Sequence, residues 1–171
     1  MQIEPATIED ARAIADIHIE AWRAAYRSIV STDYLDTLSI EEKASVWRKA
    51  IIGGTPQLLV ARIEDEIVGW IAFGPCRDEG AKDDEGEIWS LYVKPACWSK
   101  GARRQLWCQA REYLIAQGFK TVRLWVLADN AQAIGFYRAM GFVCQSETPQ
   151  KFFLNGQSLW ELCYARTLAD E

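Results

Sequence analysis

The sequence predicts a single domain, residues 1–171, of the α/β (α+β) class: one twisted, mixed, mostly antiparallel sheet of six to seven strands with helices on both faces. The expected elements follow in the order β-α-α-β-β-β-α-β-α-β-β. Hairpins and two strand–helix–strand crossovers in this order imply a mixed sheet. The central hairpin strands are apolar on both faces, which indicates a sheet covered on each side.

The N-terminal part begins with an expected strand at residues 2–4 and a long helix that Thr7 starts, with Asp10 three residues later in a near capping box. One face of this helix carries Ala11, Ile14, Ala15, His18, Trp22 and Ala25 at three- and four-residue spacing, and His18 is expected to be a core residue and not a base. A second helix begins at Ser39, where Glu42 completes a capping box, and ends at residues 53–54, both glycine.

Residues 57–63 and 67–74 are expected strands of a hairpin, joined by a turn at residues 64–66. An acidic stretch, residues 78–87, precedes the next strand, residues 87–95, which Pro95 terminates. The acidic stretch is interpreted as a solvated loop. Alternatively, it forms an acidic rim that attracts a cationic substrate such as a polyamine.

In the second half, residues 100–117 have a helical pattern with Leu106, Ala110, Tyr113 and Leu114 on one stripe, and Gly118 stops it. Residues 121–127 form a strand, 130–140 a short helix, and 142–154 a strand with an expected interruption near Pro149. The Asn155-Gly156 turn then leads into the last strand, residues 158–166.

Composition and net charge argue against several classes of function. The net charge of −5 argues against nucleic-acid binding, which needs a basic face. No apolar run approaches the roughly 20 residues that span a bilayer, and MQIEPATIED lacks a secretory pattern, so we expect no membrane association and a cytoplasmic location. The five scattered cysteines and the single His18 predict neither disulfides nor a metal site.

The first segment that carries chemistry is LYVKPACWSKGARRQL, residues 91–106. A helix that opens directly after a strand presents free backbone N–H groups and a positive dipole end, which suit a pyrophosphate. Gly101 lets the backbone approach a phosphate, and Lys100, Arg103 and Arg104 add positive charge. Because basic residues in a first helical turn oppose the dipole, they indicate an anion.

The second segment is LWVLADNAQAIGFYRAMGF, residues 124–142. Asn130 caps a short helix, and Ala133 is small where another group passes close by. Phe136 faces the sheet, and Tyr137 lies about 100° further round the helix, so its hydroxyl is expected to point into a cleft between strands.

With both segments in place, the chain resembles the Gcn5-related N-acetyltransferase (GNAT) superfamily over nearly its whole length. The family pattern Asn, then A-x-x-F-Y-x-x-x-G-F, is present as Asn130, Ala133, Phe136-Tyr137 and Gly141-Phe142. The pattern V-x-P followed by Gly and Leu is present as Val93, Pro95, Gly101 and Leu106.

The resemblance implies direct acetyl transfer from acetyl-CoA, without a metal, to a primary amine of a small molecule or a peptide N-terminus. Tyr137 holds the family position of the general acid, and Glu87 is the leading base, acting through water. Trp22 and Tyr26 are expected at the acceptor, although core packing explains them equally well. The expected CoA-binding residues are Leu91, Tyr92, Val93, Trp98, Ser99, Lys100, Gly101, Ala102, Arg103, Arg104, Asn130, Ala133 and Phe136.

The chain departs from the family where Trp98 replaces an Arg or Gln and Arg103 replaces a Gly or Ala. Arg103 either crowds the phosphates or binds them. These departures motivate an alternative: a degenerate module of the same fold that binds CoA weakly or not at all and serves as a binding or sensing protein. A dinucleotide oxidoreductase is disfavoured because no G-x-G-x-x-G follows a first strand. Homodimers are frequent in the family, and the sequence leaves the oligomeric state open.

Overall fold

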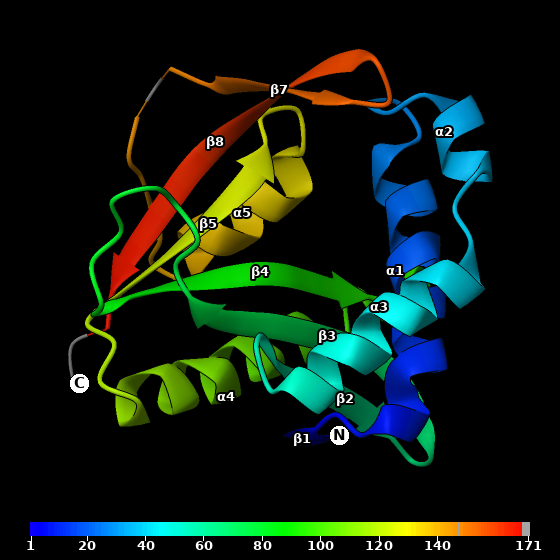
Figure 1. The fold of residues 1–171 in the computed structure, drawn as a ribbon, viewed down its shortest axis with the longest axis horizontal. Helices are drawn as coiled ribbons and strands as arrows, with labels where there is room; N and C mark the ends of the chain where they lie inside the picture. Colours follow the sequence, from blue (N-terminus) through cyan, green and yellow to red (C-terminus); the bar gives the residue numbers. More distant parts are fainter. Residues whose placement is uncertain (147, 169–171) are drawn as a thin grey trace.

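The structure is a computed structural model that describes residues 1–146 and 148–168. Its elements alternate as the sequence predicts, with short additions (Figure 1). In chain order they are β1 (Gln2–Pro5), η1 (Ile8–Asp10), α1 (Ala11–Tyr26), α2 (Thr32–Asp36), α3 (Ile40–Gly53), β2 (Gln57–Ile63), β3 (Glu66–Pro75), β4 (Glu85–Val93), η2 (Pro95–Cys97), α4 (Ala102–Ala116), β5 (Thr121–Leu127), α5 (Ala131–Ala139), β6 (Val143–Cys144), β7 (Gln150–Leu154) and β8 (Gln157–Thr167).

All strands belong to one sheet in the order β1-β2-β3-β4-β5-β8-β6, with β7 paired to β8. Only the β4–β5 pair is parallel among the described pairings, which confirms a mixed, mostly antiparallel sheet. The sheet has eight strands in the described chain, not six to seven. The expected strand 142–154 is divided, because β6 pairs with β8 near Tyr164 and β7 pairs with it at Gln157–Glu161. Pro149, which has no N–H to donate, lies between them.

The helix starts follow the capping signals. The Asp10 carboxylate accepts the Thr7 N–H at 2.8 Å, but a 3₁₀ turn comes first and α1 begins only at Ala11. The Ser39 hydroxyl accepts the Glu42 N–H at 3.3 Å, and α3 starts there as expected. The five-residue α2 was not expected. No helix in residues 1–146 and 148–168 is long and apolar enough to cross a membrane.

Two apolar layers cover the sheet, one on each face, as the hairpin strands predict. Alternate residues of β2 and β3 face α1 and α3, namely Leu58, Val60, Trp70 and Ala72. The intervening residues Leu59, Ala61, Ile71 and Phe73 face α4. Helix α5 packs on the same side as α4, through Ala133, Ile134 and Phe136. The central strands are therefore buried on both faces by helices.

The strands β4 and β5 are paired only at their beginnings. Three residue pairs join them, Glu85–Glu87 with Thr121–Arg123. Beyond this point β4 continues along β3 to Val93, and β5 continues along β8 to Leu127. Figure 1 shows the two arrows starting side by side and pointing apart. The strands are therefore splayed apart in the middle of the sheet.

A β-bulge lies in β4 where the two strands part. Ala72 of β3 pairs with Ser90, whereas the next residue, Phe73, pairs with Ile88, which leaves Trp89 as the extra residue. A bulge bends a strand and increases its twist. The bulge thus begins directly after Glu87, the last residue of β4 that pairs with β5.

The β7–β8 hairpin is fastened to the segment between α1 and α2. The Gln157 side chain accepts the Ser31 N–H at 2.9 Å and donates to the Ile29 carbonyl at 2.8 Å. Leu159 of β8 packs in a small apolar cluster with Val30 and Leu35. The α1–α2 connection and the β7–β8 hairpin thus meet at the end of the gap where β4 and β5 are furthest apart.

Gly69 is expected to be a sensitive packing position. A Cβ at this residue would lie 2.7 Å from Val93 Cγ2 and 3.0 Å from the Tyr92 carbonyl oxygen. We therefore expect Gly69→Ala to lower the free energy of unfolding by about 1–3 kcal/mol in urea titrations. Gly135→Ala is the control, because a Cβ there meets nothing within 4 Å in α5. It should be neutral or stabilise by up to about 1 kcal/mol, and an equal loss in both variants would contradict the packing argument.

Candidate active site

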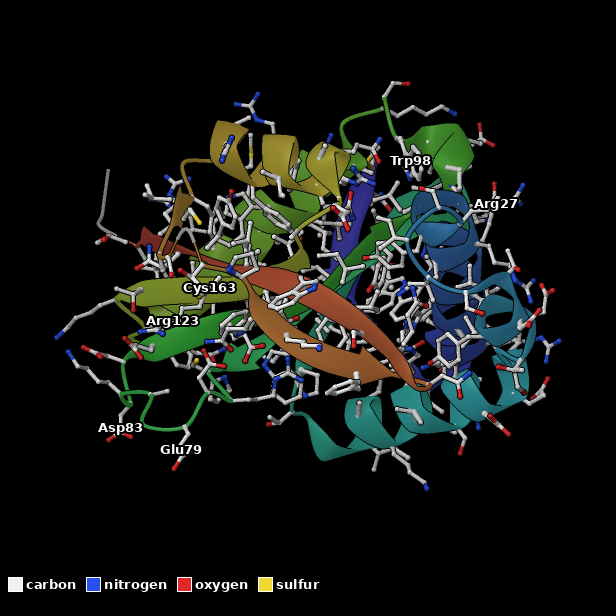
Figure 2. The ribbon with its side chains drawn as sticks, turned by 90° about the horizontal axis from the view of Figure 1, so that it is seen from above. Arg27, Glu79, Asp83, Trp98, Arg123 and Cys163 are labelled. Atoms are coloured by element: carbon white, nitrogen blue, oxygen red, sulfur yellow. The ribbon has the colours of Figure 1, made fainter. Side chains whose placement is uncertain are left out.

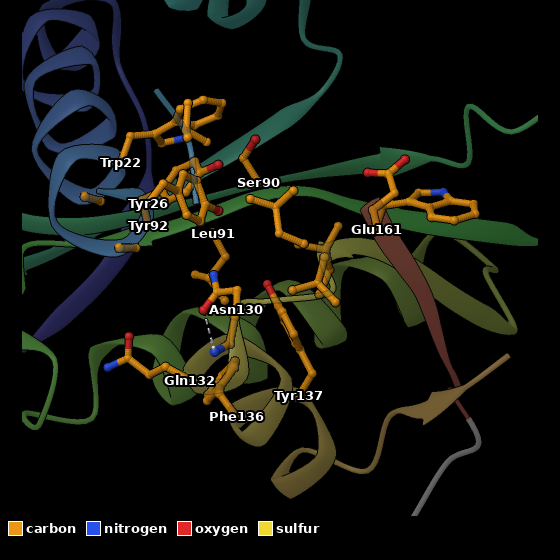
Figure 3. A pocket seen from close by; sticks show the side chains of 18 of the residues that line it. Trp22, Tyr26, Ser90, Leu91, Tyr92, Asn130, Gln132, Phe136, Tyr137 and Glu161 are labelled. Atoms are coloured by element: carbon orange, nitrogen blue, oxygen red, sulfur yellow. Dashed lines mark hydrogen bonds between the residues drawn. The ribbon is translucent and has the colours of Figure 1, made fainter. Parts of the chain in front are cut away.

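A cavity of about 230 Å³ occupies the gap between β4 and β5 (Figure 3). Ten of the residues expected from the sequence line it: Trp22, Tyr26, Leu91, Tyr92, Trp98, Arg103, Asn130, Ala133, Phe136 and Tyr137. Among the residues that the sequence argument did not single out, Trp89, Trp125, Phe152, Leu159 and Glu161 also line it. The two segments recognised from their motifs therefore meet at one cavity.

Tyr137 projects from α5 into this cavity, and Figure 3 shows its hydroxyl pointing towards β4. The Asn130 side chain fixes the start of α5 by accepting the Ala133 N–H at 3.1 Å. The Tyr137 ring lies against Phe136 and Phe142, with centroids 5.3 and 5.6 Å apart. Burial, and next the Tyr26 phenol, raise the pKa of Tyr137, while Arg103 opposes this shift. The phenol is therefore protonated at physiological pH, and it is a weaker acid than a phenol in water.

Tyr26, Tyr92 and Asn130 bring polar groups together on the α1 side of the cavity (Figure 3). Burial raises the pKa of Tyr26, although its hydrogen bonds with Tyr92 and Asn130 lower it. Burial also raises the pKa of Tyr92 well above its usual value. Both phenols remain neutral hydrogen-bonding groups over the physiological pH range.

The start of α4 forms the other end of the cavity. Gly101 adopts a left-handed conformation with φ 78° directly before the helix. Arg103 turns into the cavity and lies over the Trp98 ring, 5.3 Å from its centroid. Burial lowers the pKa of Arg103, and no carboxylate contacts its guanidinium in the part of the chain that the structure describes. An unpaired cation beside a helix N-terminus is suited to bind an anion.

Other residues of the expected CoA site lie outside the cavity lining. Val93 is one of them, and its carbonyl accepts the Trp98 indole N–H at 2.8 Å, so this carbonyl is already engaged. The remaining residues surround the α4 start: Ser99, Lys100, Gly101, Ala102 and Arg104. Of these, Ala102 is fully buried, whereas the others are exposed. The exposed turn leads from the cavity to solvent.

Glu87, the expected base, lies at the beginning of β4 with only 2% of its surface exposed. Its carboxylate accepts hydrogen bonds from the Arg77 backbone N–H at 2.9 Å and from the Arg77 guanidinium at 3.1 and 2.5 Å. Glu87 does not line the cavity. Its carboxylate is therefore occupied in binding the loop that precedes β4.

Glu161 of β8 is the carboxylate that does line the cavity, opposite Trp22 and Tyr26 in Figure 3. Burial raises its pKa, and the carboxylates of Asp78 and Glu87 raise it further. The sequence contains a signal for this residue, since Glu161 shares the strand face of the buried Leu159 and Cys163. A carboxylate on such a face needs a partner or a function.

The acidic loop before β4 is largely neutralised. Asp78 accepts a hydrogen bond from the Trp125 indole at 3.0 Å and lies 3.8 Å from Arg123. Glu85 contacts Arg123 at 3.1 Å, and Asp84 contacts Lys120 at 3.3 Å. Glu79 and Asp83 project outward at the tip of the loop (Figure 2). Most of the negative charge that suggested an acidic rim is thus paired within the protein.

His18 is a core residue, as expected. Its ring is stacked on Tyr92 with centroids 5.0 Å apart, and Nδ1 accepts the Trp47 indole N–H at 3.3 Å. Burial lowers its pKa to about 3, so it is neutral at physiological pH. The five cysteines are free thiols. Within residues 1–146 and 148–168 no group of three or more His, Cys, Asp or Glu side chains is arranged to hold a metal.

The arrangement therefore offers three chemical functions along one passage. The α4 start with Arg103 favours an anion, Tyr137 presents a proton donor at the centre, and Glu161 presents a proton acceptor at the far end. Such an order suits the transfer of a group from a long anionic carrier to a cationic acceptor.

Comparisons with known proteins agree with this interpretation. The family model described as "Acetyltransferase (GNAT) family" matches residues 13–142. A curated relative, the uncharacterized N-acetyltransferase YuaI of Bacillus subtilis, is 33% identical over 138 residues, which are 80% of this chain and 77% of the relative. Spermidine N(1)-acetyltransferase of Thermoplasma acidophilum is 24% identical over 90% of this chain and 95% of its own.

Solved structures share the fold. PaiA N-acetyltransferase of Thermoplasma acidophilum, in complex with coenzyme A, superposes with a TM-score of 0.77 at 22% identity and covers 98% of this chain and 99% of its own. YncA of Salmonella typhimurium, with its cofactor acetyl-CoA, gives 0.77 at 22% identity over 100% of this chain and 95% of its own. These two neighbours share the fold of this chain, and their structures contain coenzyme A or acetyl-CoA.

Proposed function

Because the chain belongs to the acetyltransferase (GNAT) family and is an acyltransferase, we propose that it transfers an acetyl group from acetyl-CoA to a primary amine by direct attack in a ternary complex. The observation that carries this proposal is the cavity between the splayed strands, with the Tyr137 hydroxyl in its middle. The pantetheine arm would pass between β4 and α5 and place its sulfur beside that hydroxyl. The diphosphate would rest on the α4 start, at residues 99–104.

In the proposed reaction the amine nitrogen forms a bond to the thioester carbonyl carbon, and the carbon–sulfur bond breaks. Tyr137 donates its proton to the departing thiolate, since burial keeps its phenol protonated. A backbone N–H of β4 near Leu91 would hydrogen-bond the carbonyl oxygen as negative charge develops. Asn130 and Ala133 keep the start of α5, and with it Tyr137, in position.

The primary ammonium loses two protons in all: the second, released as the amide forms, restores the Tyr137 phenol, and the first, lost before the attack, needs another acceptor. We assign it to Glu161, because its carboxylate lines the cavity and has a raised pKa, which suits a base at physiological pH. Glu87 was the base expected from the sequence, and its role stays a prediction. Its bonds to Arg77 support a positioning role in which it holds the loop over Trp89, where the Arg77 guanidinium lies 4.1 Å from the ring centroid.

Calorimetric titration with CoA and acetyl-CoA, combined with a thiol-release assay, tests the proposal. We expect binding at micromolar ligand and thiol release that depends on an added amine. The departures at Trp98 and Arg103 favour the alternative of a binding module only if they abolish the anion site. No binding at millimolar CoA would contradict acetyl transfer, and binding without turnover on any amine would support the binding module.

Arg103 is expected to strengthen CoA binding and not to crowd it, since its guanidinium lies beside the α4 start without a carboxylate partner in the described chain. A charge-assisted hydrogen bond contributes about 1.5–3 kcal/mol. Arg103→Ala should therefore weaken CoA binding by roughly tenfold to a hundredfold in calorimetry. Arg48→Ala, which removes an exposed cation from α3, should leave the affinity unchanged. Tighter binding by Arg103→Ala would show that the side chain obstructs the site.

A further inference from the structure

The acceptor end of the cavity has apolar and aromatic walls. Trp22 and Tyr26 come from α1, Trp89 from the β4 bulge, and Phe152 and Leu159 from the β7–β8 hairpin. Trp22 and Tyr26 lie edge to face with ring centroids 5.0 Å apart. Gln157 fixes the hairpin against α1–α2 and thereby holds these walls together. A ligand in this end of the cavity would contact mainly aromatic and aliphatic side chains, together with the Tyr26 hydroxyl.

Glu161 is the one carboxylate among the described residues that line this cavity. The neighbouring Asp78 and Glu87 are paired with Arg123 and Arg77, respectively. No cation contacts Glu161 in residues 1–146 and 148–168, and the one cation of the described lining, Arg103, acts on Tyr26 and Tyr137 and not on Glu161. The burial that raises the pKa of Glu161 also makes a cationic partner favourable there.

These features distinguish between classes of amine. A polyamine carries two or more ammonium groups, each of which would need its own carboxylate, whereas Glu161 is the one carboxylate of the described lining. An amino acid would place its carboxylate beside Glu161, which is unfavourable. A monoamine with an apolar body would place its ammonium against Glu161 and its body against the aromatic walls.

From this we infer that the acceptor is a primary monoamine with an aromatic or branched aliphatic body, bound with its nitrogen at Glu161 and its body between Trp22, Trp89 and Phe152. The inference rests on the proposed acetyl transfer and names its substrate class. The reaction forms an amide bond, breaks the thioester, and yields CoA thiol, a neutral, more apolar amide and one proton, which Glu161 accepts and releases to solvent.

Thiol release from acetyl-CoA, measured with 2-phenylethylamine, isoamylamine, ethylamine, spermidine and an amino acid, tests the inference. We expect kcat/KM for 2-phenylethylamine to exceed that for spermidine by about tenfold or more, as for other substrates matched to an apolar pocket. Glu161→Gln should lower kcat/KM for 2-phenylethylamine at least about tenfold, with CoA affinity unchanged in calorimetry.

Phe152 and Phe153 provide a matched pair of variants. Phe152 lines the cavity, whereas Phe153, its neighbour in β7, is 69% exposed on the outer face of the hairpin. Phe152→Ala should lower kcat/KM about tenfold for 2-phenylethylamine but little for ethylamine, and Phe153→Ala should change neither. An unfolding temperature equal to that of the wild type in both variants will show that the hairpin is intact.

The outcomes separate the two proposals. If CoA binds and spermidine or the amino acid is the preferred acceptor, the substrate inference is wrong while acetyl transfer stands. Equal effects of Phe152→Ala and Phe153→Ala would also overturn it. If neither CoA binding nor thiol release with any amine is found, acetyl transfer itself is wrong, and the inference falls with it.

Discussion

Tyr137→Phe is expected to lower kcat by about 10²–10⁴-fold, the usual contribution of a positioned general acid. The variant removes only the hydroxyl, and the ring contacts with Phe136 and Phe142 remain. CoA affinity should therefore stay within about twofold of the wild type, so that the loss appears in kcat and not in ligand binding. Steady-state thiol release and calorimetry on the same preparation measure the two quantities.

Tyr113→Phe is the matched control for this variant. Tyr113 is a partly buried phenol of α4, packed against Phe73 with centroids 6.1 Å apart, and it does not line the cavity between β4 and β5. Loss of its hydroxyl should leave kcat unchanged. An unchanged kcat in Tyr137→Phe would remove the assignment of Tyr137 as the acid.

Ala133→Leu is expected to weaken CoA binding by about a hundredfold or more, equivalent to roughly 3 kcal/mol. Ala133 lies in the first turn of α5 and lines the cavity beside Asn130, so a larger side chain there would fill the passage proposed for the pantetheine arm. Leucine suits a helix nearly as well as alanine, so α5 should remain stable. Calorimetric titration with CoA gives the affinity directly.

Ala139→Leu controls for the added volume, because Ala139 is exposed at the far end of α5. CoA should bind this variant as it binds the wild type. Wild-type affinity in Ala133→Leu would mean that no ligand passes along α5, and the proposed path of the cofactor would be wrong.

Local patterns were sufficient to predict most of the fold. The capping residue Ser39 and the glycines at 53–54 bound α3, and apolar residues on both faces of β2 and β3 predicted the two helical layers. The division of residues 142–154 into β6 and β7 was harder to predict, because it depends on where each segment pairs with β8. The five-residue α2 carries too short a pattern to identify.

The candidate site likewise has one part that the sequence predicts and another that it does not. Asn130, Ala133 and Tyr137 belong to one short segment, so their relative positions follow from helix geometry. Glu161 faces the cavity only because β8 pairs with β5, with Glu161 opposite Leu127. The engagement of Glu87 by Arg77 likewise depends on the course of a loop, which residue spacing does not determine. Contacts between distant segments were therefore the part that sequence reasoning could not supply.

The early separation of β4 and β5 leaves backbone groups unpaired inside the sheet when no ligand is bound. A sheet normally exposes unpaired backbone groups only at its two outer borders, where they can recruit foreign strands. Here the separation creates an additional border inside the sheet, between Ile88–Val93 and Leu124–Leu127. A cofactor arm lying there would act as a surrogate strand that protects this border from aggregation. Cofactor binding would then raise the free energy of unfolding, by about 2.7 kcal/mol at a ligand concentration of roughly 100 times Kd. The stability of the protein would therefore depend on the concentration of the cofactor.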